Sequence, residues 1–294
     1  MLPRADNAAM GQLDGKTAVI TGSTRGLGNA IAAAFLAEGA RVVVSGRHDA
    51  SARIAAEKLD PTGTHVLAIR CDVSNLQSVR ELSRGTIEHF GRYDIWVNNA
   101  GLSAPFGPTA LIPADMFASV LNTNIIGTYY GTHCALQHFV PERRGKIVNI
   151  LGRGDTGAVP LQAAYSTSKF WLKAFTETVA KEQRDSGVGI FGYNPGLMTT
   201  EFLSHAEAIE GYEARLNPLK TVVRMWGNPP EVPALEIVKL CSPATDGKTG
   251  LIRSQMHTAF MLGGAIREGA RRLFRRPLAE MTMNVKSVKA TIAR

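Results

Sequence analysis

The chain has 294 residues, of which 45% are hydrophobic and 20% are charged, and its formal net charge is +8. This composition, without low-complexity tracts or repeats, excludes a disordered, fibrous or solenoid protein and predicts one globular domain. Three cysteines without a CxxC pair, and no apolar run that would suit a signal peptide or a membrane span, predict a cytoplasmic protein. Residues 257–294 hold eight Lys or Arg against two Glu, so the positive charge is concentrated in a tail and we expect no nucleic-acid partner.

Apolar runs alternate along the chain with amphipathic runs of helical period. This alternation is typical of strands buried on both faces of a parallel sheet and joined by right-handed helical crossovers. We therefore predict an α/β fold, a doubly wound parallel sheet of Rossmann type flanked by helices, with ligands bound beyond the C-terminal strand ends. Strands are expected at 17–20 and 41–45, in runs that end at Val73 and Gly101, and at 146–150, 188–194 and 249–253; helices are expected at 29–40, 51–59, 76–90 and 163–183.

A glycine-rich turn, TGSTRGLG at residues 21–28, joins the first strand to the first helix. Gly22 permits a sharp exit from the strand, and Gly26 and Gly28 let the backbone approach a pyrophosphate and let the helix pack on the strand. The free N–H groups of the helix then face the anion. The turn therefore predicts a bound dinucleotide, with a plain strand-to-helix connection as the alternative.

Tyr165 and Lys169 lie four residues apart in a strongly helical run, so their side chains share one face of the helix. A tyrosine hydroxyl, with an ordinary pKa of about 10, is a poor acid near neutral pH, but a nearby ammonium group lowers that pKa. Such pairs also occur by chance on helices. The pair therefore indicates an active site only in combination with other motifs.

Three motifs occur in order, TGxxxGxG at 21–28, NNAG at 98–101 and YxxxK at 165–169. With them the chain resembles the classical short-chain dehydrogenase/reductase family over roughly residues 13–200. The resemblance implies that the NNAG string supports the central strand and lines the cofactor, although a purely structural hydrogen bond is an equal alternative for Asn98. The resemblance to the family also rests on Asp72 in CDV, Asn124 in LNTNIIGTYY and the PGLMT string at 195–199.

The resemblance also implies residue roles. Tyr165 would protonate a carbonyl oxygen, Lys169 would lower the tyrosine pKa and hold the nicotinamide ribose, and Asn124 would anchor a proton-relay water. Asp72 would bind the adenine, and Thr199 would meet the nicotinamide carboxamide. The predicted cofactor-binding residues are Gly22, Thr24, Arg25, Gly26, Leu27, Gly28, Arg47, Asp72, Val73, Asn99, Ala100, Gly101, Tyr165, Lys169, Pro195, Gly196 and Thr199.

The choice between the two nicotinamide cofactors depends on charge at the end of the second strand. Relatives that prefer NAD have an acid there, whereas this chain has Gly46 followed by Arg47. Arg47 and Arg25 could pair with a 2′-phosphate through charge-assisted hydrogen bonds. We therefore predict NADP(H), with solvated arginines as the alternative.

The chain departs from the family at the position 13 residues before the catalytic tyrosine, where Gly152 stands in place of the usual serine. Loss of such a donor costs about 10²- to 10³-fold in turnover. Three explanations stay open: another donor such as Thr156 or Ser103 substitutes, the substrate or a water supplies the hydrogen bond, or the nucleotide serves a different role. Arg153 could meet an anionic substrate or be solvated. The predicted substrate-binding residues are Gly152, Arg153, Ser103, Tyr212 and Trp226.

Two segments lie outside the central pattern. Residues 199–233 are expected to be an irregular lid over a hydrophobic or aromatic substrate, with a surface elaboration as the alternative. The run from Met261 to Arg276 is expected to be a basic amphipathic helix, with Leu262, Ile266, Ala270 and Leu273 on one stripe. Packing within a homodimer or homotetramer is the favoured interpretation of this helix, and peripheral contact with an anionic membrane is the other.

Together these features predict an NADP(H)-dependent oxidoreductase of ketoreductase type, acting on a carbonyl or alcohol carbon of a small organic molecule. The alternatives are a regulatory or scaffold protein that binds the nucleotide, and a non-redox enzyme that uses Tyr165 as acid-base. The histidine spacing gives no support for a metal site. We divide the chain into a flexible tail at 1–12, the oxidoreductase domain at 13–256 and the basic helical extension at 257–294.

Overall fold

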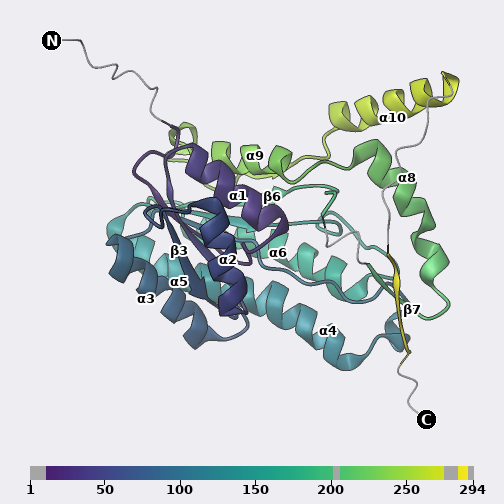
Figure 1. Ribbon diagram of the computed structural model, residues 1–294, viewed down its shortest axis with the longest axis horizontal. Coiled ribbons are helices and arrows are strands. Elements are labelled where there is room, and N and C mark those ends of the chain that lie inside the picture. Colours follow the sequence, from purple (N-terminus) through teal and green to yellow (C-terminus); the bar gives the residue numbers. More distant parts are fainter. Residues whose placement is uncertain (1–10, 201–205, 275–283, 291–294) are drawn as a thin grey trace.

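The computed structural model describes residues 11–200, 206–274 and 284–290, and a seven-stranded sheet lies at its centre (Figure 1). The strand order is β3-β2-β1-β4-β5-β6-β8, and all neighbouring strands are parallel. The predicted doubly wound sheet is confirmed, and its order reverses between β1 and β4, where such folds bind their ligands. The strands of this sheet are β1 (Thr17–Ile20), β2 (Arg41–Gly46), β3 (Val66–Arg70), β4 (Ile95–Asn98), β5 (Lys146–Ile150), β6 (Gly189–Asn194) and β8 (Ile252–Ser254).

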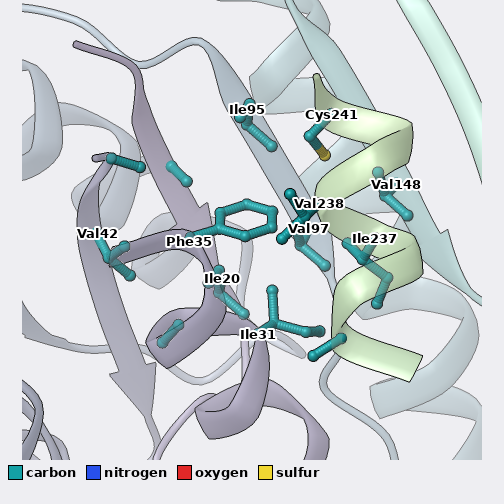
Figure 2. Packing of buried hydrophobic residues seen from close by; sticks show 14 of the residues in the cluster. Ile20, Ile31, Phe35, Val42, Ile95, Val97, Val148, Ile237, Val238 and Cys241 are labelled. Carbon is teal, nitrogen blue, oxygen red and sulfur yellow. The ribbon is translucent and has the colours of Figure 1, made fainter. Parts of the chain in front are cut away.

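Helices cover both faces of the sheet. One buried cluster joins α1, α2 and α9 to it, and a second joins α3, α5 and α6. Figure 2 shows Phe35 of α1 beside Val97 of β4 and Val238 of α9 in the first cluster. The helices are α1 (Gly26–Ala37), α2 (Asp49–Leu59), α3 (Leu76–Phe90), α4 (Ala114–Leu121), α5 (Gly127–Glu142), α6 (Ala163–Glu182), α8 (Asn217–Trp226), α9 (Glu231–Cys241) and α10 (Thr258–Leu273), with a π turn η2 (Asn122–Ile126) and 3₁₀ turns η1 (Thr109–Leu111), η3 (Glu213–Leu216) and η4 (Pro243–Thr245).

Two strands of the sheet, β3 and β4, end earlier than the sequence suggests. Predicted strand ends at Val73 and Gly101 are wrong, because β3 ends at Arg70 and β4 ends at Asn98. The residues that follow leave the sheet as loops at its C-terminal edge. This edge is where a doubly wound sheet binds its ligand, and apolar character alone does not mark the point at which pairing stops.

The segment 199–233, expected to be irregular, contains regular elements over its described residues. It includes a strand β7 (Glu207–Ile209), the turn η3 and helix α8. β7 pairs in parallel with β9 (Lys286–Val288), so the chain returns near its C-terminus to form a second, two-stranded sheet. The function of this segment as a lid stays a prediction.

The two terminal segments are only partly described. Residues 1–10 of the expected N-terminal tail lie outside the described residues, whereas the backbone amide of Gln12 donates to Glu38 Oε2 at 2.8 Å. The expected tail helix is α10, which packs on α8 at the periphery of the molecule (Figure 1). Residues 275 and 276 lie outside the described part of the chain.

Candidate active site

The glycine-rich turn after β1 has no room for side chains at two of its glycines, Gly22 and Gly28. Gly22 has a φ of +62°, and a Cβ there would lie 2.8 Å from Cα of Ala100. A Cβ on Gly28 would lie 2.5 Å from Nδ2 of Asn99. Helix α1 begins at Gly26 with no side-chain cap and no acidic residue in its first turn. Its N–H groups and the close backbone packing fit the pyrophosphate of a dinucleotide.

The NNAG string holds this turn in shape. Asn99 Nδ2 donates to the carbonyl oxygens of Thr21 (2.9 Å) and Gly22 (3.0 Å), and Thr21 Oγ1 accepts from the Asn99 backbone amide (3.0 Å). The Asn99 side chain therefore supports the turn that would bind the cofactor. Asn98 is a buried structural residue, with hydrogen bonds to Trp96 (2.8 Å), Thr132 (3.0 Å) and Asn149 (2.8 Å).

The end of β2 has no space for a carboxylate. A Cβ on Gly46 would lie 2.7 Å from Cγ2 of Thr24, because the glycine-rich turn packs directly on this position. Arg25 and Arg47 are exposed in the adjoining loops, and Arg70 at the end of β3 donates from Nε to the Arg47 carbonyl at 3.1 Å. Sequence reasoning missed Arg70, although its place at a strand end was a signal. These guanidinium groups give a positive charge to the region at the ends of β2 and β3, which we call the positive corner.

Three predicted cofactor residues also have structural contacts. Asp72 Oδ1 accepts hydrogen bonds from the backbone amide (3.0 Å) and hydroxyl (2.7 Å) of Ser74, and so holds the turn after β3. Val73 is buried against Gly127, and Leu27 is buried in the core cluster of α1. Because their side chains are packed inside the protein, Val73 and Leu27 offer a cofactor mainly their backbone groups.

The loop after β6 lies beside the glycine-rich turn. A Cβ on Gly26 would be 3.9 Å from Cγ2 of Thr200. Gly196, with a φ of +70°, donates its amide to Asn194 Oδ1 at 2.9 Å. Thr199 donates its amide (2.9 Å) and its hydroxyl (3.3 Å) to the carbonyl oxygen of Asn228. The structure thus brings this loop, which starts at the buried Pro195, to the dinucleotide cradle.

Tyr165 and Lys169 lie on one face of α6 at the same edge of the sheet. Lys169 is buried, its Nζ donates to the Ile150 carbonyl at 2.8 Å, and it lies 5.6 Å from the centre of the Tyr165 ring. Contrary to the expected lowering, burial and then the charge of Asp155 raise the pKa of Tyr165 to about 12. Burial lowers the pKa of Lys169 to about 8, against the opposite influence of Asp155. Tyr165 is therefore held in its protonated form.

Asn124 lies in the π turn η2, which interrupts the helical run between α4 and α5. Its Oδ1 accepts from the Leu102 amide (2.8 Å), and its Nδ2 donates to the Leu102 carbonyl (3.0 Å) and to Ser168 Oγ (2.9 Å). Ser168 Oγ in turn donates to the Tyr165 carbonyl at 2.7 Å. A Cβ on Gly101 would lie 3.5 Å from Asn124 Oδ1 and 3.9 Å from Lys169 Nζ, so the predicted catalytic groups converge.

Gly152 lies directly beneath the tyrosine hydroxyl. A Cβ at this position would be 2.6 Å from Tyr165 Oη and 3.4 Å from Lys169 Cε. The space for a serine side chain is therefore already filled. Of the two expected substitute donors, Thr156 is exposed, and the Ser103 hydroxyl donates to the next carbonyl along the chain at 3.1 Å.

Asp155 is a buried acid beside the tyrosine and lysine that sequence reasoning missed. Its amide donates to the Gly152 carbonyl (3.1 Å), and its Oδ2 accepts from Asn194 Nδ2 (2.8 Å). Burial raises the pKa of Asp155, and the hydrogen bond from Asn194 and the charges of Lys173 and Lys169 oppose that rise. The available signal was an acidic residue in a glycine-rich loop directly after a strand that leads into the ligand edge.

The other predicted substrate residues lie in different elements. Arg153 is exposed, and Tyr212 is half-buried between β7 and η3. Trp226 is engaged in helix packing, because its Nε1 donates to the Met261 carbonyl at 3.0 Å and its indole contacts Gly264 of α10. Trp226 thus makes a structural contact between α8 and α10, and its role in substrate binding stays a prediction.

Within residues 11–200, 206–274 and 284–290, no group of three His, Cys, Asp or Glu side chains could hold a metal ion. In the same part of the chain, no helix combines the length and the apolar character needed to cross a bilayer.

A dinucleotide cradle at the switch point of a parallel sheet, with a tyrosine and lysine pair beside it, defines a nicotinamide-dependent oxidoreductase. The family described as short chain dehydrogenase matches residues 16–210 of this sequence. The chain belongs to the classical short-chain dehydrogenase/reductase family. Members of this family act on small molecules with a nicotinamide cofactor, and this chain is an oxidoreductase of that kind.

Three similar proteins illustrate the relationship. Glucose 1-dehydrogenase 2 of Bacillus subtilis is 32% identical over 224 residues, which cover 76% of this chain and 86% of that protein. The 3beta-hydroxysteroid dehydrogenase 1 of Eggerthella lenta is 32% identical over 254 residues, or 86% and 94% of the two chains. The crystal structure of 3-ketoacyl-(acyl-carrier-protein) reductase from Brucella melitensis complexed with NADH is 27% identical, has a TM-score of 0.74 and covers 83% of this chain and 97% of its own.

Proposed function

We propose that the protein is an NADP(H)-dependent reductase of ketoreductase type that passes hydride between nicotinamide and a carbonyl or alcohol carbon. One observation carries the proposal. Lys169 Nζ and Asn124 Oδ1 both lie close to Gly101, beside the dinucleotide cradle, and Lys169 also lies close to Tyr165. This proximity supports Tyr165 as a proton donor and Lys169 as a cation beside a bound nicotinamide ring and a substrate carbonyl.

In reduction, a nicotinamide cofactor held at the glycine-rich turn and beside Lys169 would supply the hydride for the carbonyl carbon. Tyr165 Oη donates its proton to the carbonyl oxygen, which yields the alcohol and leaves a phenolate that recovers a proton from water. The positive charge of Lys169 stabilises this phenolate. Asn124 positions the tyrosine through Ser168, which hydrogen-bonds the backbone of α6.

The preference for NADP(H) is supported by the positive corner at the ends of β2 and β3. Arg47→Gln should weaken NADPH binding by about tenfold or more, since a charge-assisted hydrogen bond contributes about 1.5–3 kcal/mol. NADH binding should not change. Arg53→Gln is the matched control, because Arg53 is exposed on α2 and paired with Asp49 at 2.7 Å. Dissociation constants from fluorescence titration test this, and tighter binding of NADH than of NADPH would contradict the proposal.

The substrate is proposed to be a small hydrophobic or aromatic molecule. A screen of ketones, quinones and polyketide-like aromatics, in which NADPH oxidation is measured, identifies the class of the substrate. Gly152 favours a second candidate, a nucleotide-binding regulatory or scaffold protein, because the usual serine donor is missing. A third is a non-redox enzyme that uses Tyr165 as acid-base. Both are supported if NADPH binds tightly while no carbonyl compound is reduced.

The assembly is proposed to be a homodimer or homotetramer formed through α5 and α6. Tyr129 on α5 and Phe170 on α6 are exposed, and Trp171 stacks on Phe175 with ring centres 4.6 Å apart. Light scattering on the intact chain and on Phe170→Gln measures the assembly, which the variant should weaken. A cytoplasmic location is also proposed, supported by three free, buried cysteines.

A further inference from the structure

Helix α10 presents its apolar side chains to solvent. Leu262, Ile266 and Leu273 are 59%, 70% and 77% exposed, and Phe274 after the helix is 66% exposed. Leu262, Ile266 and Leu273 recur at intervals of four and seven residues and so form one stripe along the helix. An amphipathic helix that belonged only to this chain would turn such a stripe toward the core.

The opposite, polar side of α10 holds the helix on α8. Glu268 is 6% exposed and accepts hydrogen bonds from Arg224 (3.0 Å) and from Arg271 (2.9 Å). Trp226 of α8 packs against Gly264, where a side chain would collide with its indole. These contacts fix the rotation of α10 about its axis, and the apolar stripe on the other side therefore faces solvent.

The sequence around the stripe is basic. Arg267 is exposed, and the sequence from Arg271 to Arg276 contains four arginines, of which the last two lie outside the described residues. The acidic residue of α10, Glu268, is buried and already shared by two arginines. Symmetric pairing of α10 with a second copy would therefore bring like charges together. An anionic lipid surface complements both the arginines and the apolar stripe.

We propose that α10 lies in the interface of an anionic lipid bilayer, with Leu262, Ile266 and Leu273 inserted among the lipids and the arginines at the headgroups. Of the two interpretations of the tail, the exposed stripe and the buried acid favour the membrane. The helix has 16 residues and is about 24 Å long, so it lies along the surface and does not span the bilayer. The protein would be held as a peripheral membrane protein.

The experiment is co-sedimentation of the full chain with vesicles of phosphatidylcholine alone or mixed with phosphatidylglycerol. The test variant is Ile266→Gln with Leu273→Gln, which changes two exposed side chains and leaves the contacts of Glu268 intact. Ile54→Gln is the matched control, because Ile54 is 53% exposed and belongs to α2, which lies far from α10 (Figure 1). Melting temperature and NADPH binding are measured for all three proteins to establish that each is folded.

The intact chain and Ile54→Gln should bind the phosphatidylglycerol vesicles, and the double variant should bind them about tenfold or more weakly. Added salt should weaken the binding of the intact chain, since part of the attraction is electrostatic. Equal sedimentation with and without phosphatidylglycerol, or unchanged binding of the double variant, would overturn the proposal. So would an oligomer that dissociates in the double variant while no vesicle binding is seen, because a second copy would then cover the stripe.

Discussion

Replacement of Gly152 by serine, the residue usual in the family, is expected to damage this active site. A Cβ at position 152 would be 2.6 Å from Tyr165 Oη, whereas ordinary contacts begin at 3.4 Å, so the hydroxyl must move by about 0.8 Å, the difference between the two. Lys169 Cε is already at 3.4 Å from that Cβ and limits relaxation on its side. A misplacement of about 1 Å costs about 10²-fold in rate, or about 2.7 kcal/mol.

The matched variant is Gly152→Ala, which adds the same Cβ without a hydroxyl. Both variants should lower kcat for carbonyl reduction by about 10²-fold, with the dissociation constant for NADPH unchanged. Stopped-flow or steady-state NADPH oxidation measures the rates. The reasoning would be refuted if Gly152→Ser exceeded the wild-type kcat while Gly152→Ala fell below it, because the site would then lack a donor and have room for one.

Three further variants test the remaining groups. Tyr165→Phe should lower carbonyl reduction by about 10²- to 10⁴-fold, and activity near the wild-type value would exclude Tyr165 as the acid. Asp155→Asn removes a negative charge that raises the pKa of both Tyr165 and Lys169, so the rising limb of the pH profile for alcohol oxidation should move to lower pH; an upward shift would contradict this. Asn98→Ala should reduce the free energy of unfolding by about 3 kcal/mol, because it leaves buried partners unpaired. Chemical denaturation measures that change, and a loss below about 0.5 kcal/mol would refute the structural role of Asn98.

The sheet and its helices follow from local signals in the sequence. The runs predicted at 146–150 and 76–90 coincide with β5 and α3. Each is bounded by residues that end its pattern, and a parallel sheet buried on both faces demands continuous apolar strands. The glycine-rich turn could also be predicted from the sequence, because Gly22 and Gly26 both have φ near +60°, a conformation that favours glycine.

The side chains that complete the site depend on contacts between distant segments. Asp155 meets Asn194 across 39 positions of sequence, and no periodicity in either segment reveals that contact. The tail shows a second limit. The helical period of the sequence identified the apolar stripe of α10, but it did not reveal which face of the helix contacts the protein. The contact face depends on the ion pair between Arg224 of α8 and Glu268 of α10.

The geometry around Gly152 supports an altered active site, not a damaged one. Tyr165 Oη lies where a serine side chain would be, and the glycine is what permits this placement. Asp155 is buried beside the pair, and its charge helps to keep the proton on the tyrosine. A protonated tyrosine is the form that reduces a carbonyl, whereas alcohol oxidation needs the phenolate. Gly152 thus permits the position of the tyrosine hydroxyl, and Asp155 favours its protonated form, which is the form that the proposed reduction requires.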